Sequence, residues 1–259
     1  MSEGGKVLLF RFAVDNFVFQ FDQDRVDKLS AFLNRSGLAN LTVNDVFDGL
    51  ARYAASTGLI QRSGFGQWLA KLSESLTDND VRLFESMFDA FDRSDSGVVD
   101  IVELVCGLSV LCSGSKSDKL AYAFDSLDDD ADGFLTKRGL WRYFRAFLSV
   151  LITLSGAFDG MAHNTRMSTL DETSVWTATE ILSSFSASST SNELSGVSFE
   201  EIAEWYSLAG HSKATWLELL DLKKWTRYQG QGGSASEAGT QDVYDSKDEG
   251  DAQDSSFGL

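Results

Sequence analysis

Apolar and polar residues alternate near the start of the chain. Every second residue is apolar in two short runs, at Leu8, Phe10 and Phe12 and again at Phe17, Phe19 and Phe21. A period of two is typical of a strand with one buried face, and the Asp15-Asn16 pair between the runs suits a turn. The pattern predicts a short hairpin over 7–21, with a single buried helix as the alternative, followed by a helix over 22–34.

Further along the chain, the apolar period becomes that of a helix on both sides of two polar segments, 92–103 and 128–139. The spacing i, i+3, i+4, i+7 puts apolar side chains on one helix face. Around the first segment these are Phe84, Met87, Phe88 and Phe91, then Ile101, Leu104, Val105, Leu108 and Leu111. Around the second they are Leu120, Phe124 and Leu127, then Leu140, Phe144, Phe147 and Leu151. Each segment is predicted to join two amphipathic helices.

Such helix–loop–helix units need partners to cover their apolar faces, and two weaker units supply them. Upstream, predicted helices over 46–55 and 63–73 flank a Gly58-Leu59-Ile60 turn; downstream, predicted helices over 176–186 and 199–209 flank 190–201. The eighth loop position is apolar, at Val99, Leu135 and Val197, which suits short strands that join paired loops. The predicted fold class is all-α with minor β: four units in two lobes, 43–113 and 116–210.

Other segments extend or interrupt these lobes. Residues 1–42 form an N-terminal extension, 156–175 a polar insertion, and 213–228 an apolar-dense C-terminal helix that could dock on the second lobe. From 229 to 259 the chain is rich in Gly, Ser, Asp and Glu and has few large apolar residues. A disordered acidic tail is therefore expected there.

Residues 92–103, the first loop, carry oxygen ligands at the spacing that calcium requires. Positions 1, 3, 5, 7, 9 and 12 are Asp92, Ser94, Ser96, Val98, Asp100 and Glu103. Val98 would contribute its carbonyl, Glu103 would close the shell with two oxygens, and Gly97 at position 6 allows the sharp bend. Calcium binding is predicted here, with a loop that keeps its shape without metal as the alternative.

Residues 128–139, the second loop, have a denser acidic front. Positions 1, 3 and 5 are Asp128, Asp130 and Asp132, and the carbonyl of Phe134 is at position 7. Position 12 is Gly139, so two of about seven oxygens are missing, and with them the preference for calcium over magnesium. A weaker Ca²⁺ or Mg²⁺ site and a solvated acidic turn both stay open. The frame at 190–201 has lost most of its ligands, and no metal is expected there.

Composition narrows the function classes. A formal charge of −17 and a pI near 4.4 argue against nucleic acid as a partner and fit a protein that binds cations. Cys106 and Cys112 are expected as free thiols in a reducing compartment. No catalytic motif is recognised, so an enzyme is not expected. Neither a signal peptide, a myristoylation start nor an 18-residue apolar run is found, so a soluble cytoplasmic protein is predicted.

The sequence over 99–141 carries a family likeness. It reads VDIVELVCGLSVLCSGSKSDKLAYAFDSLDDDADGFLTKRGLW and resembles the neuronal-calcium-sensor branch of EF-hand proteins, with calcineurin B as a more distant member. The shared features are the apolar helix with its acid after the first loop, the GLSVL joint and the KLxxAF start of the next unit. The likeness extends over about 83–145 and implies EF-hand units, with a degenerate hand before a competent one.

In an EF-hand sensor, the carboxylate at position 12 is drawn to the metal and the following helix moves, which exposes an apolar groove. Here Glu103 would be that lever. The candidate groove residues are Phe84, Met87, Phe88, Leu104, Leu108 and Leu111, with plain core packing as the alternative. An amphipathic helix of a protein partner suits such a groove. The hypothesis is a non-catalytic calcium sensor; a calcium-independent scaffold and a passive calcium buffer are the alternatives.

Overall fold

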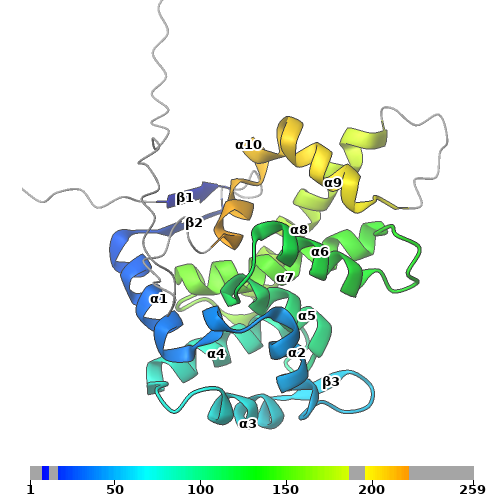
Figure 1. Cartoon of the computed structure of the whole chain (residues 1–259). Coiled ribbons are helices and arrows are strands. Elements are labelled where there is room, and N and C mark those ends of the chain that lie inside the picture. The colour runs from blue at the N-terminus through cyan, green and yellow to red at the C-terminus, as the bar shows by residue number, and fades with distance from the viewer. Residues whose placement is uncertain (1–7, 12–16, 187–195, 222–259) are drawn as a thin grey trace, which may run out of the picture. The chain divides into compact units, whose positions relative to one another are not determined.

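The computed structural model describes residues 8–11, 17–186 and 196–221 (Figure 1). Contacts between residues divide the chain into the units Met1–Gln229 and Gly230–Leu259. The second unit, and with it the whole acidic tail predicted for 229–259, lies outside the described residues. The first unit is mostly helical, which confirms the predicted all-α class with minor β.

The N-terminal hairpin is confirmed. Strands β1 (Leu8–Arg11) and β2 (Val18–Phe21) are antiparallel, and Phe10 lies opposite Phe19 with ring centroids 5.0 Å apart. Helix α1 (Gln23–Ser36) follows, capped by the Asp22 carboxylate and ended by Gly37 at a positive φ of 71°. Glycine adopts that backbone conformation more readily than residues with a side chain, so Gly37 favours the end of the helix. The short 3₁₀ turn η1 (Leu38–Asn40) leads on from it.

The first pair of hands spans seven elements. The hand predicted to be degenerate contains α2 (Val43–Ala51), β3 (Leu59–Gln61) and α3 (Arg62–Leu72). The hand predicted to be competent contains α4 (Asp78–Phe91), β4 (Val98–Asp100) and α5 (Ile101–Leu108), extended by the 3₁₀ turn η2 (Ser109–Leu111). Strands β3 and β4 are antiparallel, with Ile60 opposite Val99. The predicted joining of paired loops through the eighth position therefore occurs here.

The second pair repeats the arrangement with less strand. It contains α6 (Lys116–Leu127), α7 (Lys137–Ser155), α8 (His163–Ser186) and α9 (Phe199–Trp205). Leu135 and Val197 form an isolated antiparallel bridge, and each donates its N–H to the other's carbonyl over 2.9 Å. This second bridge joins the second loop to the end of the degenerate fourth frame, as the apolar eighth positions predict.

Helix α8 is longer than the sequence pattern suggests, because it begins inside the segment expected as a polar insertion. Its hydroxyl side chains bond within the helix: Thr173 Oγ1 donates to the Thr169 carbonyl over 2.7 Å, and Thr177 Oγ1 donates to the Thr173 carbonyl over 2.9 Å. Both threonines are buried. A helix can bury such residues because their hydroxyls donate hydrogen bonds to its own carbonyls. Buried positions of α8 are therefore partly polar, and the sequence there lacks the apolar period of a helix.

The C-terminal helix predicted for 213–228 is described only as far as Asp221, and this part is helical in short pieces. A π-helix η3 (Tyr206–Gly210), a helical turn α10 (His211–Lys213) and a 3₁₀ helix η4 (Thr215–Leu220) follow α9; residues 222–228 lie outside the described ones. Trp216 is buried edge-on against Phe144, with ring centroids 6.0 Å apart. Lys119 is also buried, donating to the carbonyls of Val110 (3.1 Å) and Leu220 (2.7 Å), and burial lowers its pKa to about 8.

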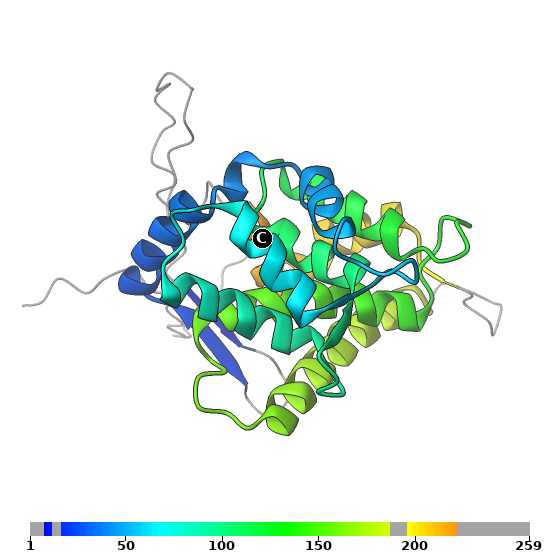
Figure 2. The ribbon, with the colours of Figure 1, turned by 90° about the horizontal axis from the view of Figure 1, so that it is seen from below.

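Helix α7 organises the core of the first unit. It packs against its neighbour α8 and also against α4 and α5 of the first pair of hands. A Cβ on Gly107 of α5 would lie 2.6 Å from the Ala146 carbonyl of α7, so these two helices touch at a residue that must be small. Helix α1 lies beside α4 in both views (Figures 1 and 2), with the Phe32 and Phe84 rings 5.0 Å apart. One continuous core therefore crosses the predicted boundary at 113–116, and the two-lobe division stays a prediction.

Candidate metal-binding loops

The first loop is shaped by the carboxylate of Asp92. Its Oδ1 accepts hydrogen bonds from the backbone N–H (2.8 Å) and the hydroxyl (3.1 Å) of Ser96, and its Oδ2 accepts from the Gly97 N–H over 2.6 Å. The side chain is 1% exposed. Positive φ angles at Asp95 (53°) and Gly97 (73°) make the bend. The Ser96 hydroxyl also lies 3.4 Å from the Val98 carbonyl, so the oxygens of positions 1, 5 and 7 converge.

The remaining predicted ligands of the first loop have other partners. Asp100 Oδ1 accepts from the N–H groups of Val102 (2.8 Å) and Glu103 (3.1 Å), which caps α5. Glu103 Oε1 accepts from Arg142 Nε of α7 over 2.6 Å. Ser94 is exposed. The fold brings Asp92, Ser96 and Val98 together, and it holds the closing carboxylate of Glu103 on a guanidinium.

The second loop has the same backbone bend with a different charge distribution. Ala131 and Gly133 have positive φ angles of 56° and 83°, at the same loop positions as Asp95 and Gly97. Asp128 Oδ2 accepts from the Gly133 N–H over 2.8 Å, as Asp92 does from Gly97. The acids at positions 1, 3 and 5 lie together: among the described residues, Asp128, Asp130 and Asp132 form the one group of three potential ligands whose oxygens are all within 4.8 Å of one another.

Two features show that this acidic group is electrostatically unsatisfied. Asp128 Oδ1 is buried and has no hydrogen-bond donor among the described residues. Repulsion from the Asp132 carboxylate, with a smaller contribution from the neighbouring Asp128 carboxylate, raises the pKa of Asp130 above its ordinary value. An orphaned buried oxygen beside two further carboxylates suits a divalent cation. Phe134, whose carbonyl was predicted as a ligand, has an exposed ring, and its N–H bonds to Asp132 Oδ1 over 2.9 Å.

The degenerate frame at 190–201 lies partly outside the described residues, which resume at Gly196. Its acid at position 12, Glu201, is used as a helix cap: Glu201 Oε2 accepts from the Ser198 N–H over 2.8 Å, and the Ser198 hydroxyl accepts in return. The described part of this frame therefore contributes structure to the second loop through Val197.

The sequence of this chain is similar to those of several known proteins. A recoverin family protein of Dictyostelium discoideum is 30% identical over 140 residues, which are 53% of this chain and 61% of that protein. A guanylyl cyclase inhibitory protein of Lithobates pipiens is 30% identical over 99 residues, 38% of this chain and 47% of the relative. This chain resembles the neuronal calcium sensors among EF-hand proteins.

The similarity covers only part of the length of each relative. The chain spans about half to three-fifths of the length of these two sensors. Human ubiquitin carboxyl-terminal hydrolase 32 is 26% identical over 178 residues, which are 61% of this chain and only 11% of that protein. No protein-family model matches the chain. Among the described helices, none combines the length and apolar character that a membrane span needs.

The six residues predicted to line a sensor groove are fully covered in this structure. Phe84, Met87, Phe88, Leu104, Leu108 and Leu111 are each 0% exposed. Phe84 packs against Phe32 of α1 and lies edge-on to Trp68 of α3, with 6.3 Å between the ring centroids. Helix α7 lies across α5, as the close approach at Gly107 shows. Elements outside the hand formed by α4 and α5 therefore cover its apolar face.

Two arginines near the first loop make contacts that the sequence pattern does not predict. Arg142 lies between the loops: besides Glu103, it reaches both carboxylate oxygens of Asp129 through Nη1, at 3.0 and 2.9 Å. Arg62 pairs with Asp89 (2.6 Å), lies 3.9 Å from Asp92 and stacks over Phe88. The partners are far apart in sequence, so no spacing rule connects them.

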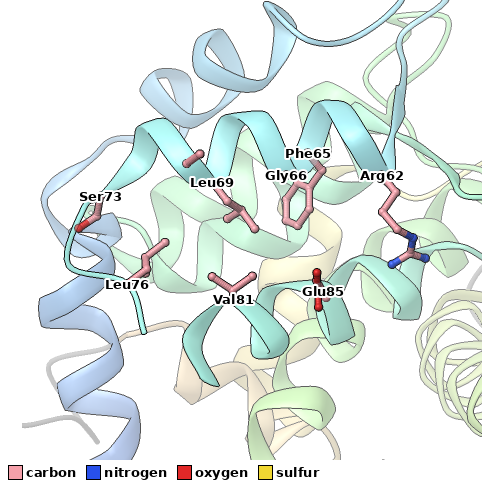
Figure 3. A pocket seen from close by; sticks show the side chains of 9 residues that line it. Arg62, Phe65, Gly66, Leu69, Ser73, Leu76, Val81 and Glu85 are labelled. Atoms are coloured by element: carbon pink, nitrogen blue, oxygen red, sulfur yellow. The ribbon is translucent and has the colours of Figure 1, made fainter. Parts of the chain in front are cut away.

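Arg62 also borders a cavity between α3 and α4, of about 310 Å³. Figure 3 shows Phe65 and Leu69 of α3 facing Val81 and Glu85 of α4, with Arg62 at one end. The cavity thus has a mainly apolar lining and ends at the arginine that faces the first loop. Helix α4, which forms one wall of the cavity, leads into that loop.

Proposed function

We propose that this chain is a calcium-responsive, non-catalytic regulatory protein that works in the cytoplasm and engages a protein partner. The observation that carries the proposal is that the first and second loops have matching backbone bends and that each is joined by a short bridge to its neighbouring helix–loop–helix unit. In the second loop, the buried Oδ1 of Asp128 also has no hydrogen-bond donor among the described residues. The resemblance to calcium sensors supports the same reading. Asp92, Ser94, Ser96, Val98, Asp100 and Glu103 would hold calcium in the first loop, and Asp128, Asp130, Asp132 and the carbonyl of Phe134 would hold calcium or magnesium in the second.

The response would start at Glu103. A bound calcium ion supplies two positive charges that favour a bidentate carboxylate at position 12. To provide one, Glu103 must leave Arg142, and because Glu103 lies in the first turn of α5, that helix moves with it. Leu104 and Leu108 follow on the same helix and are buried against the rest of the core. Their movement would uncover apolar surface between α4 and α5, where an amphipathic helix of a partner could bind.

The partner class comes from the relatives and the charge. The frog relative is named as an inhibitor of a guanylyl cyclase, and only the coarser idea of a protein target is carried to this chain. A net charge of −17 favours a helix with basic residues around its apolar stripe.

Tryptophan emission tests the proposal. Trp68 of α3 is 4% exposed and lies against Phe84 of α4, so opening of the competent hand should shift its spectrum. The full chain is measured in EGTA and then at rising free calcium. A shift at micromolar calcium is expected, lost in Trp68→Phe and kept in Trp216→Phe, whose ring packs on α7 instead.

Glu103→Gln provides the control for the site, because it keeps the size of the side chain and removes its charge. If the shift survives in that variant, the first loop is not its source. Calcium binding measured by calorimetry without any spectral change would indicate a buffer instead. Absence of both binding and spectral change would indicate a calcium-independent scaffold and overturn the proposal.

A further inference from the structure

One guanidinium serves acids from both loops. Arg142 of α7 donates from Nε to Glu103, the closing residue of the first loop, and from Nη1 to Asp129, the second residue of the second loop. Its side chain is 13% exposed and that of Glu103 21%, whereas Asp129 is 76% exposed. The bond to Glu103 is therefore the better shielded of the two, and charge-assisted bonds of this length are strong ones.

The environment of Arg142 favours this double pairing. Burial works against its charge, but the hydrogen bonds that Arg142 donates to Glu103 and Asp129, with the negative charges of these acids, outweigh burial and raise the pKa of Arg142. Arg142 is therefore a fixed positive charge whenever the protein is folded. Glu103 cannot present both oxygens to a metal and keep this bond unchanged, so the two cations compete for one carboxylate.

We propose that Arg142 is an internal competitor for calcium, which sets the affinity of the first loop and couples it to the second; this rests on the proposed function. In the metal-free chain, Arg142 neutralises Glu103 and steadies α5 against α7. Calcium that binds to the first loop must first release Glu103 from Arg142, and the free energy that this release costs lowers the calcium affinity. A variant without the guanidinium should lose folding stability and gain calcium affinity.

The same geometry implies that the two loops assist each other. Asp129 lies between two residues of the acidic group, Asp128 and Asp130. A divalent cation held there puts two positive charges beside the guanidinium, which weakens its hold on Asp129 and then on Glu103. Displacement of Arg142 by either site would benefit the other, and such coupling is reciprocal for binding free energies.

The first experiment compares Arg142→Met with Arg138→Met in the full chain. Methionine keeps most of the apolar stem of the side chain, and Arg138 is an exposed residue on the same helix, so its variant reproduces the loss of one charge. By calorimetry, Arg142→Met should bind calcium at the first loop about tenfold more tightly, the worth of one charge-assisted bond. Arg138→Met should change affinity less than twofold. In EGTA, Arg142→Met should unfold at lower urea than the wild type.

The opposite signs of these two effects separate competition from mere support of the fold. A purely structural arginine would lower stability and calcium affinity together, and that result would overturn the proposal. Asp129→Asn breaks only the exposed arm and keeps the fold; it should remove the cooperativity between the loops. In a chain whose second loop is disabled by Asp130→Asn and Asp132→Asn, first-loop affinity should fall, and it should not fall when Arg142→Met is added.

A measurement without substitutions completes the test. The Nε–H resonance of Arg142 should be protected from exchange in EGTA and should shift and lose protection with calcium. If calcium binds and this resonance stays as it was, Arg142 is not displaced and the proposal fails while the proposed function stands. If the wild-type chain binds no calcium at either loop, the proposed function itself fails.

Discussion

The first and second loops have the same backbone bend and opposite deficiencies. The first keeps an acid at position 12, Glu103, but that acid is bonded to Arg142, and two of its ligand positions are serines. The second has three converging acids with an orphaned oxygen and a glycine at position 12. The first loop thus has the closing acid, and the second has the denser group of acids. Ligand spacing alone does not separate these two properties.

The neighbours of each loop explain why the deficiencies differ. Arg62 lies 3.9 Å from Asp92, and Arg142 bonds to Glu103, so positive charge is already present around the first loop. In the second loop Arg142 reaches Asp129, which is not one of the three converging acids. Positive charge therefore reduces the attraction of the first loop for cations more than that of the second.

The largest expected effect concerns the acids at position 1. In EGTA, Asp92→Ala should lower the free energy of unfolding by about 2–4 kcal/mol, because three hydrogen bonds to a buried carboxylate are lost and two N–H groups are left without an acceptor. Asp128→Ala removes the single bond to Gly133 and relieves a crowded charge, so about 1 kcal/mol or less is expected. Urea unfolding of both variants measures the difference. Equal losses would show that the first loop is not the more tightly built one.

Much of the fold could be predicted from residue patterns. The alternation at Phe10 and Phe19 predicted the hairpin, and the eighth loop positions predicted which loops lie side by side. Both signals are local, since each depends on a period of a few residues. Helix α8 was partly missed for the opposite reason: buried threonines such as Thr173 satisfy themselves inside the helix and resemble loop residues in sequence.

The candidate site was predictable only as a set of ligand positions. Nothing in the sequence joins Glu103 to Arg142, because their contact depends on how α7 packs against α5. The cover over the six groove candidates depends on the same packing. A sequence pattern identifies groups that can bind a metal, whereas competition for those groups is a property of the tertiary structure.

A smaller effect is expected from restoring the missing acid of the second loop. Gly139→Glu should tighten calcium binding there about tenfold and increase its preference for calcium over magnesium, because a carboxylate with two oxygens returns to position 12. The new Cβ would lie 3.2 Å from Leu135 Cδ2, the end of a side chain that can move slightly. Calorimetric titration with each cation measures both changes.

Gly139→Gln is the matched control for that variant, since it adds the same Cβ and similar bulk without the charge. It should fold as Gly139→Glu does and gain far less affinity. If both variants gain equally, the improvement comes from a better start to α7 and not from a metal ligand. If neither gains, the second loop does not close around its cation as the first one would.

The smallest effect concerns the crowded acids of the second loop without metal. Repulsion from Asp132 raises the pKa of Asp130, so the folded chain holds this proton more firmly than the unfolded chain. Stability is then higher below the raised pKa and falls as pH rises through it. Asp130→Asn should remove that dependence and slightly raise Tm at neutral pH in EGTA, whereas Asp125→Asn, on an exposed face of α6, should not. The wild type and the two variants are compared by calorimetric melting from pH 4 to 7.

Calcium should reverse the order of the melting temperatures and place the wild type above Asp130→Asn, because the crowded charge that destabilises the empty loop also attracts its cation. If calcium leaves the Tm of the wild type unchanged, the second loop is only a solvated acidic turn.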